Sequence, residues 1–213
     1  MFVNAYKTAL VVLSRKPIVL WGLSLMSALL SILSGIFLGI VPALGIALGY
    51  LLTCGVAKVY LDGLAGQEVY SDQLFAAFNK NCFRVAGGMA WRDLWILIWV
   101  LIPIAGPIIA IVKSYSYKFV PYILITRPDV SATQALRLSK EMTDGIKMDM
   151  FLADLCYFGA LILIVLVLSI FAMIPVIGIL FGFALLVFNV LLLAFGTIFT
   201  GLYQAYFYAV KNS

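Results

Sequence analysis

Apolar residues form three long stretches along the chain, and the charged residues lie between and around these stretches. The charge-free stretches are Pro17–Ala57, Leu94–Val112 and Leu155–Val210. A membrane-spanning helix needs about 20 mostly apolar residues, and a charged residue at its centre costs about 2.5–3.5 kcal/mol on insertion scales. The first and third stretches therefore predict two spans each. By its length, the middle stretch fits either one full span or two half-spans.

A short pattern of proline and small residues interrupts each stretch near its middle. A proline is followed three residues later by glycine, and four residues after that by glycine or alanine. Proline ends the incoming helix because it lacks a backbone donor, and glycine permits the chain to reverse. The last small residue favours close contact between helices. Three copies indicate an internal repeat that forms helical hairpins. The copies are Pro42-Gly45-Gly49, Pro103-Gly106-Ala110 and Pro175-Gly178-Gly182.

These patterns predict an all-α fold, a polytopic transmembrane helix bundle in which residues 1–213 form a single integral membrane domain. Six spans are expected, as helical hairpins at about 18–60, 85–125 and 150–203. Most basic residues then share one side of the membrane, and the positive-inside rule makes that side cytoplasmic, with both termini inside. A five-span alternative keeps the middle stretch as one helix, but it exports the basic segment 127–147.

Three shorter amphipathic segments lie outside the hairpins, at about 2–14, 72–80 and 132–144. Ser71 and Ser131 are suitable N-caps for the second and third of these helices. Each segment has apolar residues on one helical face, which is typical of helices that lie along the inner leaflet. An equally plausible alternative is that the second and third segments cover the inner end of the bundle.

The composition agrees with an integral membrane protein. Of 213 residues, 65% are hydrophobic and 11% are charged, whereas soluble domains are about half apolar and about one quarter charged. The same values exclude a disordered chain. The net charge is +5, and anionic lipid headgroups at the inner leaflet account for a basic inner surface. We therefore expect localisation to the cytoplasmic membrane and no binding of nucleic acid.

The residue types that most enzymes use are scarce in this chain. The absence of histidine removes the commonest general base and metal ligand. Cys54, Cys82 and Cys156 lie far apart, which argues against a metal cluster or a disulfide framework. The sequence contains no P-loop and no other common catalytic motif. We therefore expect a non-enzymatic protein with no metal and no cofactor.

Charged and hydroxyl-bearing residues concentrate in the second hairpin. If this hairpin crosses the bilayer, its charges lie in or near the hydrocarbon, where ionisable residues are costly and mark candidate sites. Asp93 and Lys113 then lie at depths that allow them to pair. In the alternative, the hairpin sits shallowly and its lysines extend to the headgroups. The candidate polar cluster comprises Arg92, Asp93, Lys113, Tyr115, Tyr117, Lys118, Tyr122 and, from the third hairpin, Asp154.

Two functions fit these features. The first is a non-enzymatic membrane protein that binds lipid, anionic lipid above all, or a protein partner at the inner leaflet. Self-association through the small-residue faces belongs to this hypothesis. The alternative is a small transporter, or the membrane subunit of one, that uses the candidate polar cluster. Asp93→Asn separates the two, because only the transport hypothesis predicts a loss of solute flux.

Several strings of the sequence resemble an uncharacterised bacterial family of integral membrane proteins, known as a domain of unknown function. The family is similar in layout to the membrane domain fused to some glycerophosphodiester phosphodiesterases. The resemblance implies a six-helix bundle in a bacterial cytoplasmic membrane and no known reaction. The strings are Lys113-Ser114-Tyr115-Ser116-Tyr117, Pro121-Tyr122-Ile123-Leu124, Ala135-Leu136-Arg137-Leu138-Ser139-Lys140, Gly145-Ile146-Lys147 and Tyr203-Gln204-Ala205-Tyr206-Phe207-Tyr208.

Overall fold

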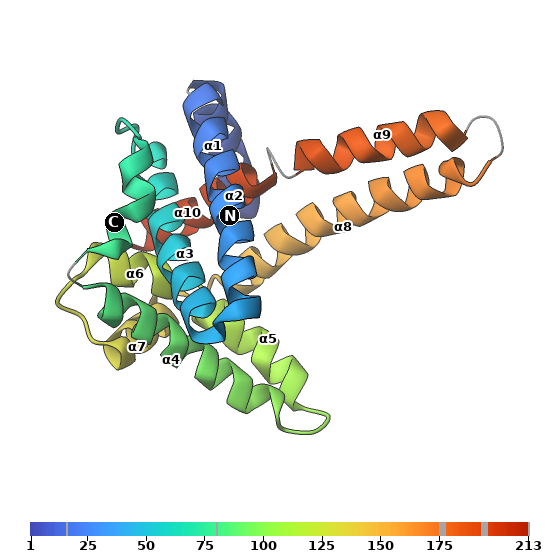
Figure 1. Cartoon of the computed structure of the whole chain (residues 1–213). Helices are drawn as coiled ribbons and strands as arrows, with labels where there is room; N and C mark the ends of the chain where they lie inside the picture. Colours follow the sequence, from blue (N-terminus) through green and yellow to red (C-terminus); the bar gives the residue numbers. More distant parts are fainter. Residues whose placement is uncertain (16, 80, 175–177, 193–195, 213) are drawn as a thin grey trace.

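The protein is all-α, as the sequence predicts (Figure 1). The computed structural model describes residues 1–15, 17–79, 81–174, 178–192 and 196–212, and these residues contain helices and no strand. The elements are α1 (Phe2–Arg15), α2 (Pro17–Ile40), α3 (Pro42–Leu64), the 3-10 helix η1 (Ser71–Phe78), α4 (Cys82–Val100), α5 (Gly106–Ser116), α6 (Val120–Thr126), α7 (Ala132–Met142), α8 (Lys147–Ala172), α9 (Gly178–Leu191) and α10 (Thr197–Asn212).

Four helical segments among the described residues are long and apolar enough to cross a membrane. They are Ile18–Ile40, Pro42–Leu64, Gly106–Thr126 and Lys147–Ala172. Two of the six expected spans are not in this set. Helix α4 carries three charged side chains among its 19 residues, and α9 is a shorter apolar helix of 14 residues, whereas a span needs about 20.

The repeat glycines place the two helices of each hairpin in direct contact. A Cβ atom built on Gly45, Gly106 or Gly178 would lie 2.3 Å from a backbone atom of the preceding helix. No side chain fits at such a distance without moving the backbone. The repeat seen in the sequence is therefore present in the structure as three equivalent close contacts between helices.

The second small residue of the repeat packs closely in two of the three copies. A Cβ on Gly49 would lie 3.3 Å from the hydroxyl oxygen of Ser34 in α2, and Ala110 is buried. Gly182 has open space around it, with no atom within 4 Å of a Cβ. Among the described residues, no packing contact of the kind predicted for Gly182 is present.

The prediction that glycine reverses the chain is also wrong. The repeat glycines do not adopt positive φ, and in the α4–α5 turn the residue with positive φ is Ile104, at 66°. The prolines do act as expected where they are described. Pro42 begins α3, with Val41 as the one residue between it and the end of α2, and Pro103 lies in the α4–α5 turn. Pro175 lies outside the described residues.

The third hairpin differs most from the expectation. We expected one helix from Gly178 to Tyr203, but this stretch is divided between α9 and α10. Figure 1 shows α8 and α9 extending to one side of the molecule, while α10 returns to the helical core. The division follows burial, because no described residue of α9 is buried, whereas α10 buries six, including Tyr203. Only Met150, Ala153 and Asp154 of α8 are buried.

The second arm of the second hairpin is divided as well. Helix α5 ends at Ser116 and α6 begins at Val120, where we expected one continuous helix to Ile125. Pro121 occupies the first turn of α6, and its missing N–H cannot continue the hydrogen-bonding ladder of α5. The three residues between the helices place Lys118 at a bend rather than on a straight helix.

Close backbone contacts make α3 a central element. A Cβ on Gly55 of α3 would lie 1.9 Å from the carbonyl oxygen of Leu74 in η1. A Cβ on Gly201 of α10 would lie 2.1 Å from the ring of Tyr60 in α3. These glycines therefore let α3 contact η1 on one side and α10 on another.

The three predicted short helices are present, with two differences. The second is a 3-10 helix whose N-cap is Tyr70 instead of Ser71, and it buries Leu74 against the core. In α7, the Ser131 hydroxyl accepts a hydrogen bond from the Gln134 N–H, so the predicted cap is confirmed. All three helices bury residues of one face against the helical core, which favours a covering role for the second and third. Their relation to a bilayer stays a prediction.

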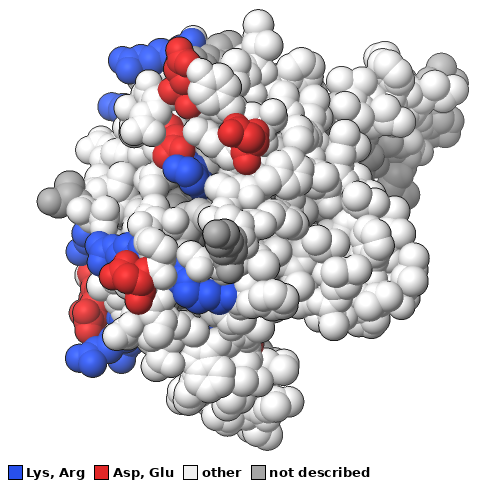
Figure 2. All heavy atoms as spheres, turned by 60° about the vertical axis from the view of Figure 1, so that its left-hand side comes forward, with Lys and Arg blue, Asp and Glu red and all other residues white. Residues whose placement is uncertain are grey.

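The charged residues are segregated in space as they are along the chain. Figure 2 shows Lys, Arg, Asp and Glu gathered over one part of the face that it presents, while a broad part of that face carries none. The charge-free helices of the hairpins are rich in exposed large apolar side chains, as expected of surfaces that contact lipid.

Candidate functional site

A cavity of about 930 Å³ lies among α2, α3, α4, α5, α6, α8 and α10. Its size is at the upper end of the range for sites that hold small molecules. The lining mixes apolar side chains such as Ile32, Leu52 and Ile96 with many that can hydrogen-bond. The hydrogen-bonding side chains without charge are Ser27, Ser31, Thr53, Tyr60, Ser114, Thr197, Thr200 and Gln204, together with the predicted tyrosines.

The structure brings most of the candidate polar cluster into this lining. The cluster members that line the cavity are Arg92, Tyr115, Tyr117, Lys118, Tyr122 and Asp154. Asp93 and Lys113 are not part of the lining. These residues come from four elements and from the α5–α6 bend, so tertiary packing assembles the site.

The predicted pair between Asp93 and Lys113 is wrong. The Asp93 carboxylate lies 2.7 Å from Nε of the adjacent Arg92. The ammonium group of Lys113 lies 5.2 Å from the centroid of the Trp99 ring, a distance typical of a cation–π contact. Adjacent residues on α4 can meet without crossing the hairpin, and the aromatic ring offers the lysine a partner close to its own level.

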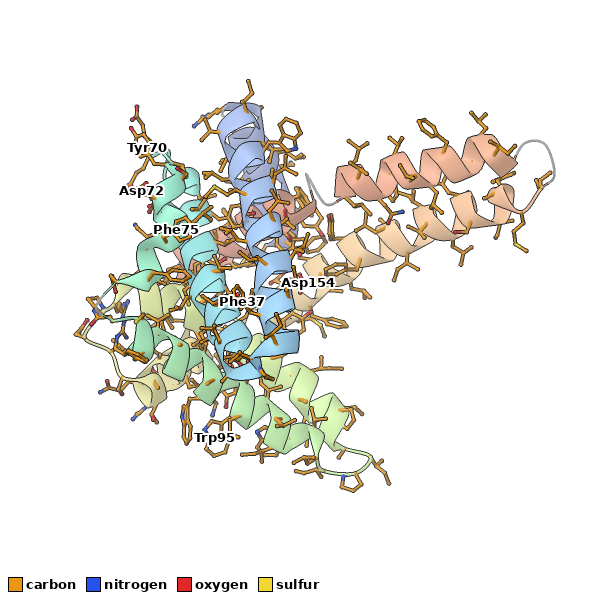
Figure 3. All side chains as sticks on the ribbon, viewed as in Figure 1. Phe37, Tyr70, Asp72, Phe75, Trp95 and Asp154 are labelled. Atoms are coloured by element: carbon orange, nitrogen blue, oxygen red, sulfur yellow. The ribbon has the colours of Figure 1, made fainter. Side chains whose placement is uncertain are left out.

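Asp154 is the best-connected side chain of the site. It lies in the first part of α8, where the helices converge in Figure 3. Its carboxylate accepts hydrogen bonds from the Tyr115 hydroxyl at 2.9 Å, from the Lys118 ammonium and from the Tyr203 hydroxyl. The residue is buried, with 8% of its surface exposed. These bonds join α8 to α5, to the α5–α6 bend and to α10.

An aromatic cluster from α1 supports the same region. Tyr6 donates a hydrogen bond to the carbonyl oxygen of Ala153, next to Asp154 in the chain. Its ring centroid lies 5.4 Å from that of Tyr203. A tyrosine hydroxyl is protonated and can donate at neutral pH, and burial raises the pKa of Tyr6 further, to about 12. Helix α1 therefore stabilises the backbone that presents Asp154.

The two cations of the described cavity lining, Lys118 and Arg92, differ in how fully their charges are paired. Lys118 is neutralised by Asp154 and also lies 4.6 Å from the Tyr115 ring centroid. Arg92 is bonded to Asp93 through Nε, and among the described residues no hydrogen bond to its terminal Nη atoms is present. A guanidinium presents a planar fork of donors that matches a carboxylate or phosphate. Arg92 is therefore the cation best placed to receive an anionic group.

The sequence analysis missed the contributions of α2 and α10 to the site. Ser24, Ser27 and Ser34 of α2 are buried, and Ser24 shares a hydrogen bond with Thr197 of α10. The signal was present in the spacing, because Ser24, Ser27, Ser31 and Ser34 recur every three or four residues and so mark one helical face. On α10, Thr197, Thr200 and Gln204 have the same property. Tyr203 adds the partner of Asp154.

The described residues contain no group of three or more His, Cys, Asp or Glu side chains that could hold a metal ion. The arrangement offers instead one arginine fork, a partly buried ion pair and many hydroxyl groups. Chemically, these groups can bind and orient a polar or anionic ligand.

Comparison with known proteins gives one match. A family model described as "Protein of unknown function (DUF975)" matches residues 26–183. The matched range includes Arg92, Lys118 and Asp154 and ends before α10. Searches of the curated proteins and of the solved structures gave no match. Because the matched range covers most of the 213 residues, the chain belongs to this family of proteins of unknown function, in agreement with the resemblance to an uncharacterised family.

Proposed function

We propose that this protein is a non-enzymatic, multi-pass membrane protein that binds a membrane lipid and holds the lipid headgroup in the cavity. One observation carries the proposal. A cavity with an arginine fork, a partly buried ion pair and many hydroxyl groups lies among helices that include segments long and apolar enough to cross a bilayer. Polar and ionisable groups in such surroundings are costly and mark binding sites.

The mixed lining favours an amphiphile over a fully polar solute. The charged side chains Arg92, Lys118 and Asp154 share the cavity with Ile32, Leu52 and Ile96. A lipid headgroup can use the first set, while the glycerol and the first part of the acyl chains contact the second. The transport alternative draws on the same polar groups, but Asp93, the residue on which its test depends, is not part of the lining.

The cavity also lies at a suitable depth for lipid of the inner leaflet. Asp154 follows the start of α8 by about 10 Å at 1.5 Å per residue, and the charged side chains at that end favour the cytoplasmic side. We propose that the protein resides in the cytoplasmic membrane with both termini inside. A single cysteine at Ala105 should then react with an impermeant maleimide in intact cells, and a single cysteine at Arg137 should react only after lysis. The opposite pattern contradicts this orientation.

The lipid proposal is tested by measuring which lipids stay bound to the purified full-length protein. Native mass spectrometry after titration with phosphatidylglycerol gives a dissociation constant for each variant. We expect Arg92→Gln to weaken binding about tenfold, because a hydrogen bond to a charged group contributes about 1.5–3 kcal/mol. Arg137→Gln is the matched control, since its side chain is 83% exposed on α7. Equal binding by wild type and Arg92→Gln overturns the proposal.

A further inference from the structure

We infer that Asp154 makes the cavity selective for the charge of the headgroup phosphate, so that a phosphodiester is accepted and a phosphomonoester is disfavoured. The inference rests on the proposed function and names the class of lipid. A phosphodiester carries one negative charge, whereas a phosphomonoester carries about 1.5 to 2 at pH 7, because its second pKa is about 6.

The Asp154 carboxylate is held in place. Three donors from three parts of the chain bond to it, and both of its oxygens are used. Two of the donors, Tyr115 and Tyr203, are neutral, so they fix the carboxylate without cancelling its charge. Within the described part of the chain, Lys118 is the cation that pairs with it. A ligand therefore meets an ion pair that contributes no net positive charge.

Arg92 is the one cation of the described lining left to attract an anion, and its charge is already shared. Its Nε atom bonds to Asp93 at 2.7 Å, and Arg92 is part of the cavity lining. The four side chains together are neutral, since Arg92 and Lys118 offset Asp93 and Asp154. A phosphodiester can bind the arginine fork at low electrostatic cost. Among the described lining residues, no further cation offsets a second negative charge, which lies in the same cavity as the fixed carboxylate of Asp154.

The charges of the ion pair lie in largely buried surroundings. Asp154 is 8% exposed, and the Lys118 side chain is 19% exposed. Solvent screens such groups much less than groups on an open surface. A difference of one unit charge in the ligand is therefore expected to produce a large difference in affinity. Asp154 acts through the field that it adds and through Lys118, so it is a specificity-determining residue without touching the phosphate itself.

The experiment compares two lipids with identical acyl chains, phosphatidylglycerol and phosphatidate, at pH 8, where the monoester is fully ionised. Native mass spectrometry of the full-length protein gives both dissociation constants and their ratio. We expect wild type to bind the phosphodiester at least about tenfold more tightly, and Asp154→Asn to lower that ratio at least about tenfold. The double variant Lys118→Gln, Asp154→Asn removes both charges of the pair and should return the ratio to near the wild-type value.

A second substitution keeps the inference testable if Asp154→Asn does not fold. Ser114 lines the cavity and is exposed, so Ser114→Lys adds a positive charge without disturbing the ion pair. Like Asp154→Asn, it should lower the preference for the phosphodiester, while the uncharged control Ser114→Gln should leave that preference unchanged. The ratio of the two dissociation constants within one variant is informative, because a general folding defect weakens the binding of both lipids alike. A wild-type ratio near one, or a ratio unchanged in both Asp154→Asn and Ser114→Lys, overturns the inference.

Two further outcomes separate this inference from the proposed function. If neither lipid binds to wild type, the proposed function itself fails. The water-soluble headgroup glycerophosphoglycerol is the probe for a site that does not need a lipid. It should compete at least about a hundredfold more weakly than phosphatidylglycerol, because it cannot bury apolar surface. Equal competition overturns the assignment to lipid.

Discussion

The α2–α3 and α8–α9 hairpins are similar in sequence character and different in structure. Both are apolar, and the most apolar 18-residue window has a mean hydropathy of 2.2 in Ile18–Ile40, 1.6 in Pro42–Leu64 and 2.8 in Lys147–Ala172. The buried share of that window is 22% in the first segment and 44% in the second, whereas it is 0% in the third. The more apolar hairpin is thus the one that makes fewer contacts with the rest of the chain, and it extends away from the core (Figure 1).

The difference follows from small and hydroxyl-bearing residues. Ser24, Ser27 and Ser34 of α2 are buried, and Gly55 lets α3 contact η1. In α8, Gly159 has no atom within 4 Å of a Cβ. Within a bilayer, apolar surface does not drive helices together, whereas small residues and hydrogen bonds do. Hydropathy therefore indicates which helices can cross a membrane, whereas packing depends on small residues and hydroxyl groups that meet a partner in the folded chain.

The largest expected effect is at the point where the extended hairpin joins the core. Asp154→Ala removes the acceptor of three hydrogen bonds and leaves Lys118 without its carboxylate, so we expect a loss of about 3 kcal/mol in the free energy of unfolding. Thermal unfolding of the detergent-solubilised protein measures it. The control is Glu141→Ala, which breaks the exposed pair with Arg137 and should cost at most about 1 kcal/mol. Equal losses in the two variants contradict the role of Asp154 as a joint between helices.

A smaller effect is expected from shortening one apolar side chain in each hairpin. Leu20 of α2 is 1% exposed, whereas Ile162 of α8 is 66% exposed. Leu20→Ala should cost about 2–3 kcal/mol, because it leaves a cavity, and Ile162→Ala should change the free energy of unfolding by no more than about 0.5 kcal/mol. Denaturation followed by circular dichroism in one detergent gives both values. A large loss for Ile162→Ala shows that α8 packs against protein after all.

The smallest effect compares one glycine from each hairpin. Gly55→Ala places a Cβ 1.9 Å from the carbonyl oxygen of Leu74, so α3 and η1 must separate, at a cost of about 1–2 kcal/mol. Gly159→Ala meets open space and should stabilise α8 by about 0.5–1 kcal/mol, since alanine is the better helix former. Melting temperatures of the two variants should shift in opposite directions. Shifts of the same sign contradict the packing difference between the hairpins.

Most of the helices could be predicted from the sequence, because helix starts and caps depend on residues a few positions apart. Pro42 begins a helix where a missing N–H is tolerated, and Ser131 caps α7 through a bond to a residue three positions away. The failures came where a distant contact overrode the local pattern. The stretch after Gly178 reads as one apolar helix, yet α10 packs in the core and α9 does not.

The sequence predicted which polar residues belong to the candidate site better than it predicted their hydrogen-bond and ion-pair partners. Charged and hydroxyl groups in an apolar segment are costly, so Arg92, Lys118 and Asp154 were identifiable from the amino-acid sequence. Their partners were not, because a side chain can bond to any neighbour that folding brings within about 3 Å. Lys113 lies over Trp99 instead of meeting Asp93, and Tyr203 bonds to Asp154 across 49 positions of the chain.

Residue types and their spacing were therefore enough to predict most helices, the prolines at helix starts and turns, the cap at Ser131 and the segments apolar enough to cross a bilayer, since each of these depends on neighbours within a few positions. Only the tertiary structure shows that α10 is separate from α9 and packs in the core. It also shows that Ser24 of α2 contacts α10 and that a cavity forms beside Asp154. These features depend on close approach between distant segments, as at Gly201 and Tyr60. Such an approach is governed by shape and by hydrogen-bond geometry in three dimensions, which hydropathy along the chain does not record.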